Sequence, residues 1–169
     1  MLEYLEPHFD ITVFYYNPCI APEEEYVHRK AVQLDLIAQM NAEGRKIRFL
    51  DCDHEHESFL RVVQGREDDP EGGARCHLCY EQRLRRTGEE AKRRGFAWFS
   101  TTLTVSPYKN AQWLNRLGLE LQETCGVPYL VSDFKKKNGY KRSIELSHQY
   151  HLYRQNFCGC EFSWREDTP

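Results

Sequence analysis

Residues 11–51 read ITVFYYNPCIAPEEEYVHRKAVQLDLIAQMNAEGRKIRFLD and contain the pattern strand, helix, strand. The first six residues are β-branched or aromatic and end at an Asn-Pro turn signal, which predicts a buried strand. A helix is expected after Pro22, because acidic residues begin it and apolar residues then recur at helical spacing as far as Gly44. A second strand is predicted over residues 46–51. Two strands joined through a helix favour parallel pairing, since parallel strands need a long crossover connection.

The rest of the chain continues this alternation. We predict a short helix at 59–63, helices at 75–95 and 111–121, strands at 96–103 and 128–133, and a last helix over 146–157. The expected fold class is α/β, with a mostly parallel sheet in a single domain spanning residues 1–169. Leu2 and Leu5 precede Pro7 and are typical of a helix end. A helix there implies an earlier strand, so we expect either that the fold begins irregularly or that an N-terminal element is missing.

Composition limits the class of protein. The chain has 169 residues, 40% of them hydrophobic and 29% charged, and a mean hydropathy of −0.74, which excludes a disordered tail or a membrane protein. The N-terminus lacks a signal-peptide pattern, so we expect a cytoplasmic protein. Thiols are kept reduced there, and seven cysteines therefore point to metal or redox chemistry rather than to a disulfide framework. The net charge of −3 still allows nucleic-acid binding through local basic patches.

Two cysteine pairs carry the strongest chemical signal. Cys76 and Cys79 are three residues apart at a predicted helix start, so both thiols lie on one face, where the helix dipole stabilises thiolates. They could hold a metal or an iron-sulphur cluster, form half of a zinc knuckle, or act as a dithiol. Cys158 and Cys160 flank one glycine, and a disulfide between them would close a small, easily reduced ring suited to electron transfer. All four sulphurs could instead bind a structural zinc ion.

The remaining candidate residues give weaker signals. Cys19 and Cys52 follow predicted strands, at the sheet edge where α/β proteins place ligands, although single cysteines, Cys125 included, often behave as small buried hydrophobes. Carboxylate and imidazole side chains could bind an additional metal or simply solvate a loop: Asp53, His54, His56 and Glu71.

Basic residues gather at two places. One set lies on the helix predicted at 75–95, where neighbouring glutamates favour an ordinary solvated face. The other is the triplet Lys135, Lys136 and Lys137 beside an Asn-Gly turn, and nearby tyrosines and Arg154 add stacking surfaces of the kind used for RNA.

Several separated motifs, in order, carry a resemblance to a known family. They are YNPCIAPEEEY at 16–26, EGGARCHLCYEQRL at 71–84, TTLTVSPYKN at 101–110, FKKKNGY at 134–140 and LYRQNFCGC at 152–160. From about Ile11 to Ser163 the chain resembles the QueH family of epoxyqueuosine reductases. The resemblance implies reduction of the epoxide of epoxyqueuosine to the alkene of queuosine at the wobble position of tRNA, without cobalamin.

The resemblance also implies a fold, a cofactor and site residues. The fold would be Rossmann-like, similar to the adenine-nucleotide hydrolase superfamily. Cys76 and Cys79 would bind a [4Fe-4S] cluster, and Cys158 and Cys160 would form a redox-active disulfide. Asp53 and Glu71 are our candidates for ligation of an additional iron or for proton delivery. Residues 135–137 and Arg154 would contact tRNA, and an external electron donor would be needed.

The chain departs from the family pattern in two ways. The family opens with adjacent cysteines of the CCAPC kind that supply two more cluster ligands, and residues 1–10 contain no such motif. We therefore expect a truncated chain or a start codon placed too late. Cys19 also stands where the family more often has asparagine.

Two other classes remain open from sequence. The chain could be a non-enzymatic zinc-binding RNA module with Cys76, Cys79, Cys158 and Cys160 as structural ligands, or a thiol oxidoreductase that uses only the last two cysteines.

Overall fold

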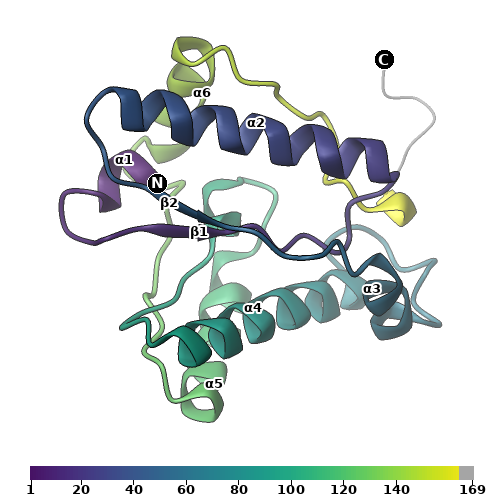
Figure 1. Ribbon diagram of the computed structural model, residues 1–169. Coiled ribbons are helices and arrows are strands. Elements are labelled where there is room, and N and C mark those ends of the chain that lie inside the picture. Colours follow the sequence, from purple (N-terminus) through teal and green to yellow (C-terminus); the bar gives the residue numbers. More distant parts are fainter. Residues whose placement is uncertain (164–169) are drawn as a thin grey trace. The chain divides into compact units, whose positions relative to one another are not determined.

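The computed structural model describes residues 1–163 and divides the chain into two units (Figure 1). The first unit contains residues 1–56 and the chain from 142 onward, and the second contains residues 57–141. The single domain expected over 1–169 stays a prediction, and its last six residues lie outside the described ones.

The first unit contains the predicted strand–helix–strand element. β1 (Thr12–Phe14) pairs in parallel with β2 (Arg48–Leu50), with Val13 opposite Phe49, and α2 (Glu23–Ala42) connects them. The helix prediction is confirmed, and both strands are shorter than the apolar runs that contain them. The α/β class and the parallel pairing are therefore correct, with two strands in the sheet of the described chain.

The core of this unit forms where α2 and the sheet meet residues near the N-terminus and the segment around Tyr150. Ile37, Met40 and Ile47 are buried there with Tyr150, whose hydroxyl donates to the Glu43 carboxylate at 2.6 Å. Partly buried residues from α1 (Leu2–Leu5) and α6 (Gly139–Gln149) pack around them. The helix expected to reach residue 157 is wrong beyond 149, because His151 adopts a left-handed φ of 51° that ends the helical path.

The second unit consists mainly of helices. α3 (His56–Val63), α4 (Ala74–Arg94) and α5 (Ala111–Cys125) confirm the predicted helices. Leu84 of α4 and Leu114 of α5 are almost fully buried in one core. At Gly88 an added Cβ would lie 2.9 Å from the Cys125 sulphur, so α4 and α5 approach closely. Cys125 is accordingly a core residue of this helix pair.

The strands predicted at 96–103 and 128–133 are wrong. One parallel bridge, between Phe99 and Tyr129, is what remains of their pairing. Beyond it the chain turns into the short 3-10 helix η1 (Thr102–Val105), whose start is capped by the Thr101 hydroxyl. The Ser100 hydroxyl donates to the Leu130 carbonyl at 3.1 Å. Side-chain hydrogen bonds thus satisfy backbone groups that a longer ladder would have used.

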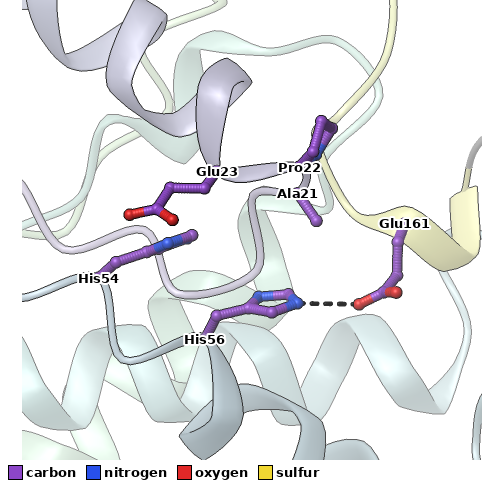
Figure 2. Close-up of a pocket in the computed structure, with 6 residues that line it drawn as sticks. All are labelled: Ala21, Pro22, Glu23, His54, His56 and Glu161. Atoms are coloured by element: carbon purple, nitrogen blue, oxygen red, sulfur yellow. Dashed lines mark hydrogen bonds and ion pairs between the residues drawn. The ribbon is translucent and has the colours of Figure 1, made fainter.

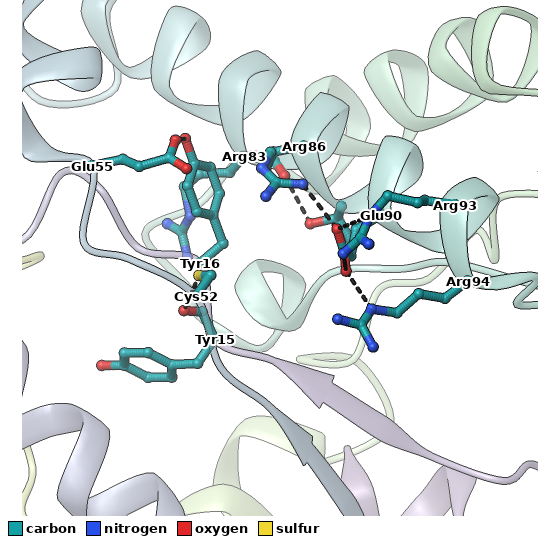
Figure 3. A network of polar contacts seen from close by, with 10 residues as sticks. Tyr15, Tyr16, Cys52, Glu55, Arg83, Arg86, Glu90, Arg93 and Arg94 are labelled. Atoms are coloured by element: carbon teal, nitrogen blue, oxygen red, sulfur yellow. Dashed lines mark hydrogen bonds and ion pairs between the residues drawn. The ribbon is translucent and has the colours of Figure 1, made fainter.

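Three arginines surround a buried carboxylate on α4. Glu90 is 3% exposed and accepts hydrogen bonds from Arg86, Arg93 and Arg94 (Figure 3). These arginines belong to the basic set that we predicted to lie on an ordinary solvated face. Their hydrogen bonds to Glu90 are made within α4 itself.

Candidate functional site

The first cysteine pair lies at the amino end of α4 in the second unit. Cys76 and Cys79 are both buried, and the Gly72 amide donates to the Cys76 sulphur at 3.2 Å. α4 has no acidic residue in its first turn and no side-chain cap at Gly73. The positive end of the helix dipole lies here, and the Asp69 carboxylate accepts from the Arg75 amide in the same turn. Two buried sulphurs one helical turn apart, with a backbone amide donating to one of them, are compatible with two ligand positions of an iron-sulphur cluster.

The loop before α4 is held by Arg75. This side chain is 1% exposed, and its guanidinium donates to the Glu67 carbonyl. The Arg75 amide donates to the Asp69 carboxylate at 3.1 Å. These contacts order the turn that carries Gly72, so the donor to Cys76 sits on a fixed backbone.

Lys109 connects Glu71 to this site. Its ammonium lies 2.9 Å from the exposed Glu71 carboxylate. The pKa of Tyr80 is raised to about 12, mainly by burial. The charge of Lys109 lowers this pKa and the charges of Cys76 and Cys79 raise it, so all three residues lie near Tyr80. Glu71 therefore lies near the cysteine pair, and its carboxylate is engaged by a lysine. No sequence pattern marked Lys109 as a candidate residue.

The lysine triplet divides into one inward and two outward side chains. Lys135 lies 3.2 Å from the Lys109 carbonyl and 3.2 Å from the Asp133 carboxylate. Lys136 and Lys137 are exposed, and Lys136 lies 3.3 Å from Asp133. Burial raises the pKa of Asp133, but hydrogen bonds from Lys135 and Lys136 outweigh that effect and lower it. Arg154 belongs to the first unit, where it is exposed and donates to the Ser147 hydroxyl.

The second cysteine pair lies in the first unit. Cys160 forms an antiparallel bridge with Ile20, and the Ala21 amide donates to the Gly159 carbonyl at 2.9 Å. Gly159 adopts a φ of 98°, which favours glycine. The Cys160 amide approaches the Cys158 sulphur at 3.4 Å. The hydrogen bond with Cys158, and then burial, strongly raise the pKa of the Cys160 thiol. The two cysteines therefore lie close together, and Cys158 affects the ionisation of the Cys160 thiol.

Cys19 and Cys52 behave differently. Cys19 is buried near Cys160. Its charge adds to the rise in the pKa of Cys160, which comes mainly from Cys158 and from burial. The Cys52 thiol donates to the Tyr15 carbonyl at 3.1 Å. Asp53 is exposed. Burial raises the pKa of Tyr26 to about 12, and the charges of Cys52 and, to a smaller extent, Asp53 contribute to this rise.

A pocket of about 540 Å³ opens beside the second pair, lined by Ala21, Pro22, Glu23, His54, His56 and Glu161 (Figure 2). His56 bridges two segments, since its Nδ1 lies 2.7 Å from the Pro18 carbonyl and its Nε2 lies 2.9 Å from the Glu161 carboxylate. His54 lies 2.8 Å from the Ile20 carbonyl, and burial lowers its pKa. Both histidines were candidate metal ligands from the sequence. In the described chain no group of three or more His, Cys, Asp or Glu side chains has an arrangement that could hold a metal ion.

Arg29 of α2 is the residue that sequence reasoning missed most clearly. Its guanidinium donates to the Phe157 and Cys158 carbonyls at 3.3 and 3.2 Å. A Glu–Arg pair four residues apart, here Glu25 and Arg29, is usual on any solvated helix. Nothing in the sequence signals that this arginine reaches a segment more than 120 positions away.

The fold and these contacts define an α/β protein with two separate pairs of closely spaced cysteines. Over residues 1–166 the sequence matches the family described as "QueH: Epoxyqueuosine reductase QueH". The chain belongs to the QueH family. Within the part that the structure describes, no helix combines the length and the hydrophobicity that a bilayer crossing requires.

Similar proteins named "Epoxyqueuosine reductase QueH" occur in several bacteria. The protein from Streptococcus pyogenes is 42% identical over 96% of this chain, which covers 64% of that relative's length. The Staphylococcus epidermidis protein is 39% identical, with 96% of this chain and 69% of the relative covered. The Thermotoga maritima protein is 36% identical, with 93% and 81% covered. This chain therefore spans about two thirds of the Streptococcus and Staphylococcus proteins.

Proposed function

We propose that the chain takes part in the reduction of epoxyqueuosine to queuosine at the wobble position of tRNA. Membership of the QueH family supports this reaction. The structural observation that supports it is the closeness of Cys158 and Cys160, whose backbone amide lies 3.4 Å from the Cys158 sulphur. The proposal includes a Rossmann-like domain, similar to the adenine-nucleotide hydrolase superfamily, and a cytoplasmic location.

The proposed electron source is the Cys158–Cys160 dithiol. Closing it to a disulfide breaks two S–H bonds, forms one S–S bond and releases two electrons and two protons. The epoxide accepts both, its two carbon–oxygen bonds break, a carbon–carbon double bond forms, and the oxygen leaves as water. Atoms and electrons therefore balance within one dithiol and one epoxide. An external donor of two electrons must then reduce the disulfide before the next turnover.

Cys76 and Cys79 are the proposed ligands that this chain supplies to a [4Fe-4S] cluster. Such a cluster, with any additional iron, would supply a Lewis acid that polarises the epoxide oxygen. Asp53 and Glu71 remain our candidates for iron ligation or proton delivery. The Lys109 ammonium at 2.9 Å keeps Glu71 engaged near the cysteine pair, so Glu71 has the better-defined environment of the two.

Transfer RNA carrying epoxyqueuosine is the proposed macromolecular partner. The exposed ammonium groups of Lys136 and Lys137 would contact phosphates, with Lys135 beside them and Arg154 as a further contact. None of these contacts reads a base, so they account for affinity rather than for the choice of tRNA.

Substitution of the dithiol tests the proposal. The full-length protein that carries this sequence is assayed anaerobically for conversion of epoxyqueuosine to queuosine, with Cys158→Ser and Cys160→Ser expected to lower turnover at least a thousandfold. Cys52→Ser is the matched control and should keep activity, because a hydroxyl can still donate to the Tyr15 carbonyl. Full turnover by Cys158→Ser would refute the redox role.

Metal analysis of the same samples separates the other classes. A brown, oxygen-sensitive protein containing iron and sulphide supports the reductase, and Cys76→Ser should lose the iron. A colourless protein with one zinc ion would instead indicate the RNA-binding module, with Cys76, Cys79, Cys158 and Cys160 as ligands. Activity in metal-free protein would indicate a simple thiol oxidoreductase.

A further inference from the structure

The segment that carries the second cysteine pair is attached to the first turns of α2. Figure 1 shows the yellow end of the chain beside this part of the helix. Arg29 makes the central contact, since one guanidinium donates to the carbonyl of Phe157 and to that of Cys158. The same guanidinium lies over the Phe157 ring, 4.9 Å from its centroid. A planar group with donors on separate nitrogens can span two consecutive carbonyls in this way, and a lysine ammonium cannot do so in the same geometry.

Arg29 is itself held in place. Its side chain is 10% exposed, and its Nε donates to the Glu25 carboxylate at 2.6 Å. The Tyr153 hydroxyl donates to the same carboxylate at 3.3 Å. A nearly buried guanidinium is stable only when its donors find partners. Its orientation is therefore fixed before it reaches the cysteine segment.

Gly159 shows how closely Arg29 approaches the pair. A Cβ at this position would lie 3.0 Å from the Arg29 Nη1 atom and 3.0 Å from Ile20. The glycine is thus enclosed between Arg29 on one side and the Ile20 backbone bridge to Cys160 on the other. With Phe157 and Cys158 fixed on one side and Cys160 on the other, the two thiols have little freedom to move apart.

We propose that Arg29 is a positioning residue for the Cys158–Cys160 pair, holding the backbone of Phe157 and Cys158 so that the two sulphurs stay adjacent and can close to a disulfide. The inference rests on the redox role proposed above for this pair. Holding two reacting groups together raises their effective concentration, because the entropy of ordering them is lost before the bond forms. Loss of Arg29 should therefore shift the equilibrium toward the open dithiol.

The test measures that equilibrium directly. Wild-type, Arg29→Ala and Arg29→Lys proteins are equilibrated with reduced and oxidised glutathione, where one dithiol and one glutathione disulfide give one protein disulfide and two glutathione thiols. Differential alkylation then reports the state of the tryptic peptide 155–165, which contains these two cysteines and no others. We expect Arg29→Ala to favour the dithiol about tenfold, equivalent to about 30 mV for a two-electron couple. Arg29→Lys should show a smaller shift.

Two further variants keep the outcome decisive. Glu25→Gln removes the negative charge beside Arg29 Nε, replaces a charge-assisted hydrogen bond with a weaker one, and should give an intermediate shift even if Arg29→Ala fails to fold. Lys30→Ala is the matched control, because Lys30 pairs with Asp51 at 2.5 Å and should leave the equilibrium unchanged. A lowered melting temperature with wild-type glutathione equilibrium in all Arg29 and Glu25 variants would overturn the inference.

Epoxide turnover separates this inference from the proposed function. If Cys158→Ser retains full turnover, the redox proposal fails, whatever the glutathione equilibrium shows. If Cys158→Ser is inactive while the Arg29 variants keep both the wild-type equilibrium and the wild-type turnover, the redox proposal stands and the positioning role fails.

Discussion

Charged side chains are buried in this protein where several polar groups surround them. Arg75 and Glu90 are 1% and 3% exposed. Arg75 donates to backbone of the loop before α4, whereas Glu90 accepts from three arginines. Burial raises the pKa of Glu90, but the hydrogen bonds from Arg93, Arg94 and Arg86 outweigh this and lower it to about 2. The ionised form is therefore strongly favoured in the folded state.

Glu90 should stabilise the fold in a pH-dependent way. Its folded-state pKa of about 2 lies below the ordinary value of 4.5, so the stabilisation is complete above pH 4.5 and is lost as the pH falls toward 2. The shift corresponds to about 3 kcal/mol, which we reduce to about 2 kcal/mol because the partner arginines are partly exposed and screened by solvent. Urea unfolding of Glu90→Gln at pH 7 should show this loss.

The neighbouring Glu89 provides the control for this prediction. Its side chain is exposed on the same helix, and Glu89→Gln should change the free energy of unfolding by less than about 0.5 kcal/mol. The difference between wild type and Glu90→Gln should also narrow as the pH falls below 4.5. A difference that stays constant down to pH 2.5 would contradict the electrostatic explanation.

Single residues also show what the sequence could and could not predict about the site. Closely spaced cysteines can be recognised directly in a sequence. One predicted pair lies at a helix start, and the other lies in a segment that forms a bridge with Ile20. Arg29 and Lys109 could not be found in this way. Their functions depend on which distant carbonyl or carboxylate the fold brings to them, and no local pattern carries that information.

Among the helices and strands, α5 shows how one small residue determines packing. A Cβ at Gly118 would lie 2.4 Å from the Tyr129 ring. Tyr129 is 3% exposed and packs edge to face on Phe99, with ring centroids 5.2 Å apart. Its hydroxyl donates to Asn115, also on α5, at 3.4 Å. The ring therefore has no free space into which to retreat from α5.

Gly118→Ala tests this contact. Alanine is favoured over glycine within a helix by about 1 kcal/mol, but overpacking a buried ring costs about 1–3 kcal/mol. At 2.4 Å the steric cost should dominate, so we expect a net loss of about 1–2 kcal/mol in the free energy of unfolding. Leu119→Ala, at an exposed position of the same helix, should have a small effect. A Gly118→Ala protein more stable than wild type would show that Tyr129 does not pack there.

In the second unit the predicted helices are confirmed and the predicted strands are wrong. α4 and α5 bury residues at helical spacing, and this periodicity is a local property of the chain. The extent of α2 was also predicted, but the apolar face expected for it is wrong: Val27, Ala31, Leu34 and Ala38 are exposed, and the helix buries Tyr26, Ile37 and Met40 instead. The run at 96–103 has the β-branched and aromatic composition of a strand, yet it makes one bridge, through Phe99. Strand formation depends on a partner of sufficient length, and the Thr101 cap redirects the chain into a 3-10 turn instead.

For the molecule as a whole, charge limits how it can meet a nucleic acid. The net charge of −3 opposes binding of a polyanion, so the proposed tRNA contact must come from a local cluster of positive side chains. Lys135 is partly occupied by the Lys109 carbonyl and Asp133. Lys136 also pairs with Asp133, but its side chain is 75% exposed against 25% for Lys135. Lys136 and the exposed Lys137 are therefore the residues of this triplet best able to reach phosphates.

Removal of these two lysines should weaken tRNA binding without changing the chemical step. We expect Lys136→Ala/Lys137→Ala to raise the Kd for tRNA about tenfold and to reduce the slope of log K against log salt by about 1.4–1.8, since each phosphate contact contributes about 0.7–0.9. The double variant Lys46→Ala/Lys92→Ala lowers the net charge equally, from −3 to −5, at other exposed positions. Binding measured by filter retention over a salt series should distinguish the two. Equal losses in both variants would mean that the total charge, rather than the Lys136–Lys137 surface, controls the interaction. A local effect leaves Lys46→Ala/Lys92→Ala close to wild type, because that variant keeps both of the lysines proposed to contact phosphates.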